Sequence, residues 1–149
     1  MTTNQQTIKV LLQEIASPNP AYYPLQPASQ QALATFEQRA IARGVPTGVT
    51  QQLVAFYQVA NAFFYDSCLG FFTCDDELIF EWWEAKELWL SLMHMDVIRW
   101  SGGKFCVGDA SNVSYSPAHE HDTLLALLTG CRDEIKEMEA AEPEPGDDF

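Results

Sequence analysis

Apolar residues recur every three or four positions in two segments near the N-terminus, which is the spacing of an amphipathic helix. Residues 7–16 form the first segment, and the two prolines within residues 17–20 end it. Residues 29–43 form the second, with Ser29 as the N-cap and Gly44 after the last turn. The apolar stripe expected on this second helix is Leu33, Phe36, Ala40 and Ile41.

Two more segments have the same helical period. One runs from about Val49 to Asn61 after a break at Val45-Pro46-Thr47. The other lies near the C-terminus, where Asp122 or Thr123 can cap a helix that ends at about Ala140. The chain therefore places predicted helices on both sides of a central region that has a different pattern.

The central region has the pattern of short strands. Residues 69–74 and 77–82 are predicted to pair across a tight turn at Asp75-Asp76. Residues 97–100 and 104–107 flank Ser101-Gly102-Gly103, which is a strong hairpin signal.

Three further predictions complete this region. Residues 84–93 fit a helix, with Leu88, Leu92 and Met95 roughly aligned. Gly108-Asp109 is expected to break the second hairpin strand, as a fold element in which Gly bends the backbone and Asp bonds nearby amides. Residues 112–116 form another short strand. The order of helices, strands and a final helix predicts an α+β fold with an antiparallel sheet.

Acidic and aromatic residues alternate between positions 75 and 87. On a strand, Leu78, Phe80 and Trp82 would share one face and build the sheet core together with Phe105. The opposite face would mix acids with Ile79 and Trp83, which suits an exposed surface with an aromatic anchor. The alternative is a solvated edge, with Trp83 covered by the next helix. The predicted partner-binding residues are Asp75, Asp76, Glu77, Glu81, Trp83, Glu84 and Glu87.

The formal charge of -13 is concentrated in the second half of the chain. Residues 1–75 carry four acidic and three basic side chains, whereas residues 76–149 carry seventeen acidic and five basic ones. Such a surface repels phosphates, so we expect no binding to nucleic acid. It attracts basic partners and accelerates their capture, although the same charges can serve solubility alone.

Length and hydropathy indicate one globular domain, residues 1–140, followed by an acidic, proline-broken tail at 141–149 that we expect to be disordered. No apolar run is long enough to cross a membrane. The polar stretch Met1–Gln6 lacks the features of a secretory signal, so we expect a cytoplasmic protein with reduced thiols.

His119-Glu120-His121-Asp122 is the strongest candidate for catalytic or metal chemistry. Two histidines at positions i and i+2 share one face of a strand and, with a carboxylate, can hold zinc. The alternative is a loop whose carboxylates favour the positive end of the following helix. Cys68 and Cys74 have poor zinc-ligand spacing, and Asp66-Ser67-Cys68 has no histidine nearby in sequence. We therefore assign no metal, cofactor or catalytic residue, and expect a protein that is not an enzyme.

Several short motifs resemble those of the SUKH superfamily, which includes the fungal cell-wall-assembly and glucan-synthesis regulators. The first group is Tyr23-Pro24-Leu25, Pro27-Ala28-Ser29, Glu37, Val45-Pro46 and the run from Leu53 to Asn61 that contains Tyr57. The second is Phe105 to Asp109, which includes Gly108, followed by Ser114-Tyr115-Ser116. The similarity covers roughly residues 22–128. One departure is Ala62, since the family often has Gly after this Asn, and a turn without that Gly is expected to be built differently.

The resemblance implies a twisted antiparallel sheet flanked by helices. It also implies a role without catalysis. Bacterial domains of this kind are often immunity proteins that neutralise a toxin, frequently a nuclease, of polymorphic or contact-dependent systems, whereas the fungal ones are scaffolds in cell-wall signalling. The immunity role is the leading hypothesis, with a basic toxin domain as the partner. The alternatives are a regulatory scaffold and a small metal-dependent hydrolase that uses the cluster His119 to Asp122.

Overall fold

The computed structural model describes residues 2–66, 69–93, 96–109 and 119–141. Its α-helices are α1 (Thr3–Ala16), α2 (Gln30–Arg43), α3 (Thr47–Val59) and α4 (Leu124–Ala141). Short 3-10 helices are η1 (Pro20–Tyr22), η2 (Glu77–Phe80) and η3 (Trp83–Ala85). The strands are β1 (Phe64–Tyr65), β2 (Leu69–Gly70), β3 (Leu88–Met93), β4 (Asp96–Ser101), β5 (Lys104–Asp109) and β6 (Glu120–His121).

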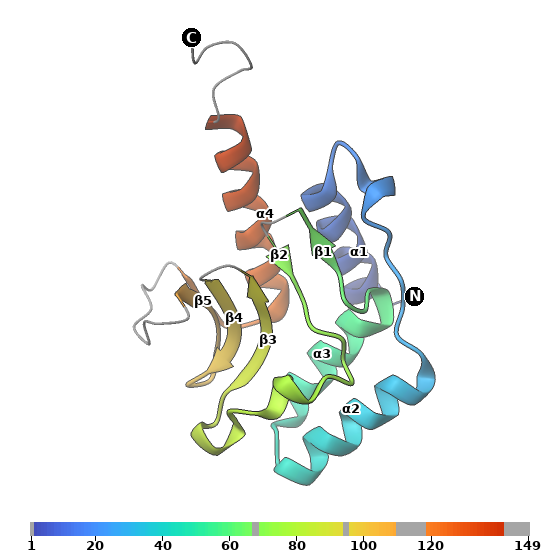
Figure 1. The fold of residues 1–149 in the computed structure, drawn as a ribbon, viewed down its shortest axis with the longest axis vertical. Coiled ribbons are helices and arrows are strands. Elements are labelled where there is room, and N and C mark those ends of the chain that lie inside the picture. The colour runs from blue at the N-terminus through green and yellow to red at the C-terminus, as the bar shows by residue number, and fades with distance from the viewer. Residues whose placement is uncertain (1, 67–68, 94–95, 110–118, 142–149) are drawn as a thin grey trace.

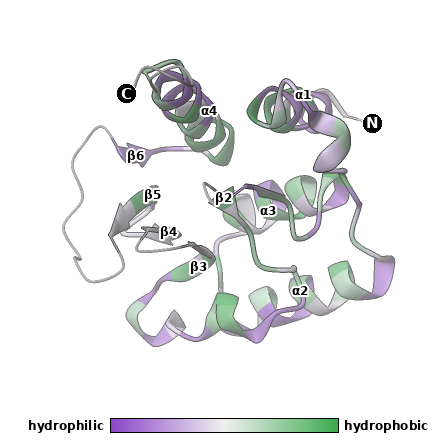
Figure 2. Ribbon diagram, turned by 45° about the horizontal axis from the view of Figure 1, so that its top comes forward, coloured by the Kyte–Doolittle hydropathy of each residue, from purple (hydrophilic) through white to green (hydrophobic). Residues whose placement is uncertain are grey.

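The strands form two antiparallel sheets, a pair β1-β2 and a four-stranded sheet in the order β3-β4-β5-β6. Helix α4 crosses one face of the larger sheet and packs beside α1 (Figure 1). Figure 2 shows α1 and α4 on one level, α3 on the next and α2 at the far side. The predicted α+β fold, with N-terminal helices and a C-terminal helix around an antiparallel sheet, is confirmed.

The predicted helix caps are present. The Ser29 hydroxyl accepts a hydrogen bond from the Ala32 amide at 3.1 Å, and Gly44 ends α2 with a φ of 75°. The Thr123 hydroxyl accepts one from the Ala126 amide at 3.1 Å, so Thr123 caps α4. Ile41, however, is 73% exposed and does not belong to the buried stripe of α2. The buried residues of α2 are Phe36 and Ala40, so its buried stripe is narrower than predicted.

The predicted hairpin of residues 69–74 and 77–82 is wrong. Residues 77–80 form the helix η2, which begins where the Asp76 carboxylate accepts a hydrogen bond from the Leu78 amide at 2.9 Å. The residues that precede the turn lie along β3 instead, where the Phe72 amide donates a hydrogen bond to the Leu90 carbonyl at 3.0 Å. Asp76 therefore caps a helical turn, and the Asp75-Asp76 pair does not close a hairpin.

The predicted helix of residues 84–93 is also wrong, because most of it is strand β3. Leu88 pairs with Trp100 and Trp89 with Arg99, and Leu88 and Leu90 alternate into the core. Met95 lies outside the described residues. The intrinsic helix propensity of a segment contributes little free energy. Here the pairing of β3 with β4 and the burial of Leu88 and Leu90 outweigh it.

The hairpin β4–β5 is confirmed. Ser101 pairs with Lys104, and the two glycines between them have φ of 63° and 82°, which residues other than glycine rarely adopt. Gly108-Asp109 does not break β5, since Gly108 pairs with Val97 within the strand. The predicted strand 112–116 and the tail 142–149 lie outside the described residues.

The turn after α3 keeps the conformation that favours glycine, although no glycine is present. Ala62 has a φ of 58°, in the left-handed region. The preceding Asn61 fixes this turn through two hydrogen bonds. Its backbone N–H donates to the Gln26 carbonyl at 2.7 Å, and its side-chain oxygen accepts from the Cys74 backbone N–H at 2.8 Å. The expectation that a chain with Ala62 builds this turn differently is therefore wrong.

Replacing Ala62 by glycine is expected to stabilise the protein. A left-handed conformation costs a non-glycine residue about 1–2 kcal/mol. Glycine loses more chain entropy on folding than alanine does, at a cost of about 0.5–1 kcal/mol. The difference leaves a net gain of about 0.5–1 kcal/mol for the glycine variant. Urea unfolding of Ala62→Gly measures this gain. The control is Ala34→Gly on the exposed surface of α2, which should lose about 1 kcal/mol. A loss of stability in both variants would contradict the strained turn.

Candidate functional site

The candidate site is the segment 75–85, called here the acidic loop, which connects the β2 region to β3. It lies beside α2 at the end of the sheet (Figure 1). Asp75, Glu77, Glu81 and Glu84 are exposed on it. Leu78 and Trp82 are also exposed, to 44% and 46% of their surface. The loop therefore presents carboxylates and apolar side chains together, which the sequence predicted, but with a different set of apolar residues.

Helix α2 holds the acidic loop through its last two turns. The Arg39 guanidinium donates a hydrogen bond to the Asp75 carbonyl at 2.6 Å and lies 3.8 Å from the Glu77 carboxylate. The Arg43 guanidinium lies 4.8 Å from the centre of the Phe80 ring. Between helix and loop is a surface depression of about 680 Å³. Its walls carry both signs of charge, so the two arginines neutralise part of the negative field of the loop.

Trp83 is not the exposed aromatic residue that strand alternation predicts. Its indole N–H donates to the Arg43 carbonyl at 2.8 Å, and its ring stacks on Trp100 at 6.3 Å between ring centres. The Lys86 ammonium lies 4.9 Å from the same ring. Trp83 thus anchors the loop to α2 and β4. The alternative prediction, that Trp83 is covered, agrees better with the structure. However, α2 and β4 cover Trp83, and a following helix does not.

Trp82 is the most exposed of the four tryptophans. The 3-10 turns η2 and η3 place positions 82 and 83 on different sides from those a strand would give them, because a 3-10 helix has three residues per turn and a strand has a side-chain period of two. The same change buries Ile79 and exposes Leu78, which strand alternation had assigned the other way round. The signal in the sequence was Asp76, whose side chain is a good N-cap for a short helix.

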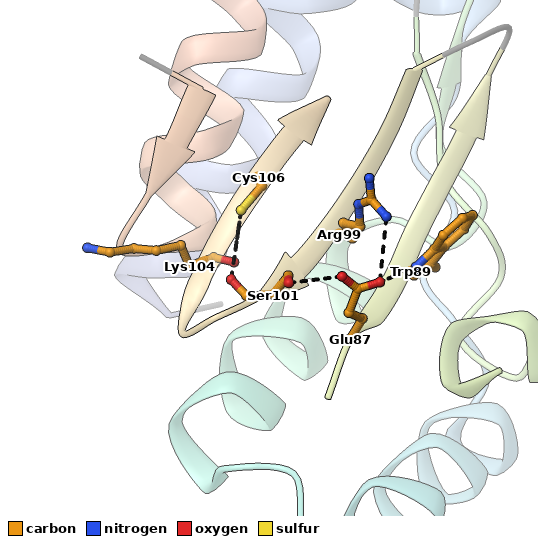
Figure 3. A network of polar contacts seen from close by, with 6 residues as sticks. All are labelled: Glu87, Trp89, Arg99, Ser101, Lys104 and Cys106. Atoms are coloured by element: carbon orange, nitrogen blue, oxygen red, sulfur yellow. Dashed lines mark hydrogen bonds and ion pairs between the residues drawn. The ribbon is translucent and has the colours of Figure 1, made fainter. Parts of the chain in front are cut away.

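Glu87 lies immediately before β3, and its side chain contacts the sheet and not the acidic loop (Figure 3). Its carboxylate lies 3.5 Å from the Arg99 guanidinium, and accepts hydrogen bonds from the Trp89 indole at 3.2 Å and the Ser101 hydroxyl at 3.0 Å. Arg99 is only 2% exposed. A buried guanidinium is costly without a carboxylate, so Glu87 has a structural role in balancing this charge.

Tyr57 and Asn61, the two motif residues of α3 and its exit, also have structural contacts. Tyr57 is fully buried, and its carbonyl accepts a hydrogen bond from the Ala28 amide at 2.9 Å. Burial raises the pKa of its phenol, whose oxygen has no hydrogen-bond partner among the described residues. Asn61 joins the connector before α2 to Cys74, immediately before the acidic loop. The Asp109 side chain is not described.

Both histidines of the candidate metal cluster contact α4. His119 Nε2 lies 2.9 Å from a Glu134 carboxylate oxygen. His121 pairs with Phe105 in the sheet. A Cβ at position 130 would lie 3.1 Å from the His121 ring, so the absence of a side chain at Gly130 leaves room for that ring. Asp122 forms an ion pair with Lys104, which lowers the pKa of the carboxyl group and raises that of the amine. Within the described ranges, no three His, Cys, Asp or Glu side chains are arranged to hold a metal ion.

The described thiols are not activated nucleophiles. Burial raises the pKa of Cys74 to about 11 and that of Cys131 to about 12, and it raises the pKa of Cys106 as well. A reactive cysteine needs the opposite shift, because the thiolate is the attacking species. Cys68, Ser67 and His94 lie outside the described residues.

Comparison with known proteins gives no relative: no family model, no curated protein and no solved structure matches the chain. The resemblance to the SUKH superfamily therefore remains a prediction from short motifs. None of the described helices combines the length and the apolar character needed to cross a membrane.

The structural role of Glu87 can be separated from the exposed charges by two matched substitutions. Glu87→Gln keeps the shape but removes the charge opposite Arg99, so it should lower the free energy of unfolding by about 1–3 kcal/mol. Glu84→Gln, on the exposed part of the acidic loop, should stay within about 0.5 kcal/mol of the parent. Urea unfolding measures both. Equal stabilities of the two variants would contradict the assignment of Glu87.

Proposed function

We propose that this chain is a non-enzymatic binding protein of the immunity type, which neutralises a basic toxin domain, of the nuclease class, from a bacterial polymorphic or contact-dependent system. The observation that carries the proposal is the acidic loop, which exposes four carboxylates around Leu78 and Trp82. Exposed aromatic residues at the centre of a charged surface are typical of binding hot spots.

The electrostatics of the loop support a basic partner. Glu81 and Glu84 have no ion-pair partner among the described residues, so their charges are available to a second molecule. A nuclease surface that binds phosphates is itself basic, and carboxylates can occupy the positions where phosphates would lie. Attraction of this kind raises the association rate more than it raises the final affinity.

The direct test is complex formation with a purified nuclease toxin domain encoded beside this gene, observed by gel filtration at low and moderate salt. The proposal expects a stable complex and loss of nuclease activity when the two proteins are mixed in equal amounts. Absence of a complex with every such domain would overturn it. Capture instead of an enzyme of cell-wall synthesis would favour a regulatory scaffold, and bound transition metal in the purified protein would favour the hydrolase.

Reversing one charge on the acidic loop should slow the association with such a toxin domain. Glu81→Lys is expected to reduce the association rate by about 3- to 10-fold at low salt, and by less at high salt, where charges are screened. Stopped-flow fluorescence measures the rate.

The matched control is Glu137→Lys on an exposed position of α4, which changes the net charge by the same amount. It should slow association by less than Glu81→Lys does. Equal effects of both variants would mean that total charge, and not the acidic loop, attracts the partner.

A further inference from the structure

The Trp82 ring packs against Trp89 and leaves part of its surface, called here its open face, exposed to solvent. Its ring centre lies 5.3 Å from that of Trp89, with 30° between the planes. Trp89 in turn lies on the sheet, where its indole N–H is bonded to Glu87. The Trp82 ring is therefore backed by a fixed aromatic surface, while nearly half of the residue remains in contact with solvent.

Three other aromatic rings of this region lie close to cations of the same chain. The Arg99 guanidinium lies 5.1 Å from the centre of Trp89, the Lys86 ammonium 4.9 Å from Trp83, and the Arg43 guanidinium 4.8 Å from Phe80. Trp82 has no such cation among the described residues. Tryptophan is the strongest of the three aromatic side chains in attracting cations, so the open face of Trp82 is suited to a cation from a second molecule.

The charges beside Trp82 favour a cation on that face. Glu81 precedes it and Glu84 follows two positions later, and both carboxylates are exposed. Neither carboxylate has an ion-pair partner in the part of the chain that the structure describes, so both charges are available to a cation that a second molecule brings to this part of the loop. The combination of an aromatic face and free carboxylates matches a planar guanidinium, which can stack on the ring and donate to a carboxylate at the same time.

We propose that the open face of Trp82 binds an arginine side chain of the protein partner, with Glu81 and Glu84 as the carboxylates that surround it. This inference rests on the proposed function, because it names the chemical group by which a basic partner would be recognised. It makes Trp82 the specificity-determining residue of the acidic loop. The bound group would be an arginine and not a lysine, whose compact ammonium cannot stack in this way.

The test uses a short synthetic peptide of alternating arginine and glycine as the probe. The indole N–H resonance of Trp82, assigned by its loss in Trp82→Phe, is followed by NMR during titration. We expect a saturable shift of this resonance. A peptide of equal length with citrulline in place of arginine has the same shape without the charge, and should leave the resonance unmoved. A lysine peptide should bind more weakly than the arginine peptide.

Substitution of the ring gives the second readout. Trp82→Leu keeps an apolar side chain but removes the aromatic face, and should weaken binding of the arginine peptide by about 2- to 5-fold. Trp82→Phe should fall between the parent and the leucine variant. Equal binding of arginine and citrulline peptides, equal or tighter binding of the lysine peptide, or unchanged affinity in Trp82→Leu would each overturn the proposal.

A failure of this proposal can be told apart from a failure of the immunity role. If the arginine peptide binds at Trp82 but no toxin domain forms a complex, the site stands and the proposed function fails. If a toxin domain binds Trp82→Leu as tightly as it binds the parent, the complex stands and the role of Trp82 fails.

Discussion

The burial of two consecutive side chains, Ile79 and Phe80, determines the conformation of the acidic loop. Both lie in the core, and Phe80 packs 5.8 Å from Phe36 of α2 between ring centres. A strand with one face in solvent cannot bury two neighbours, because successive side chains point to opposite sides. A helical turn can, and η2 provides it. Each full burial of this kind contributes about 1.5–3 kcal/mol, which exceeds any local preference for a strand.

The exposed surface follows from this burial. With Ile79 and Phe80 in the core, Leu78 and Trp82 are exposed, and Trp83 reaches the end of α2. The loop is attached at both ends, by Arg39 at Asp75 and by the pairing of β3 with β4 after Glu87. Its carboxylates are thus presented from a fixed backbone, which limits the conformational entropy that binding would cost.

Sequence reasoning succeeded where the local signal and the tertiary structure agree. The helix caps at Ser29 and Thr123 and the glycine hairpin at Gly102-Gly103 specify their own conformations, and the α+β class follows from their order. It failed in the acidic loop, where alternation was read as a strand although Asp76 can also cap a helix. It failed again at β3, since only pairing with β4 shows that Leu88 and Leu90 belong to a strand. Glu87 could not be assigned from sequence, because its partner Arg99 is brought to it by the register of the sheet.

Hydroxyl-radical footprinting of the purified protein tests the conformation of the acidic loop most directly, because it measures the solvent accessibility of individual side chains. The helical turn predicts faster oxidation of Trp82 than of Trp83, and of Leu78 than of Ile79. A strand would give the reverse order in both pairs. Protection of Trp82 and Leu78 together with oxidation of Trp83 and Ile79 would contradict the structure of the loop, and with it the surface on which the proposed function depends.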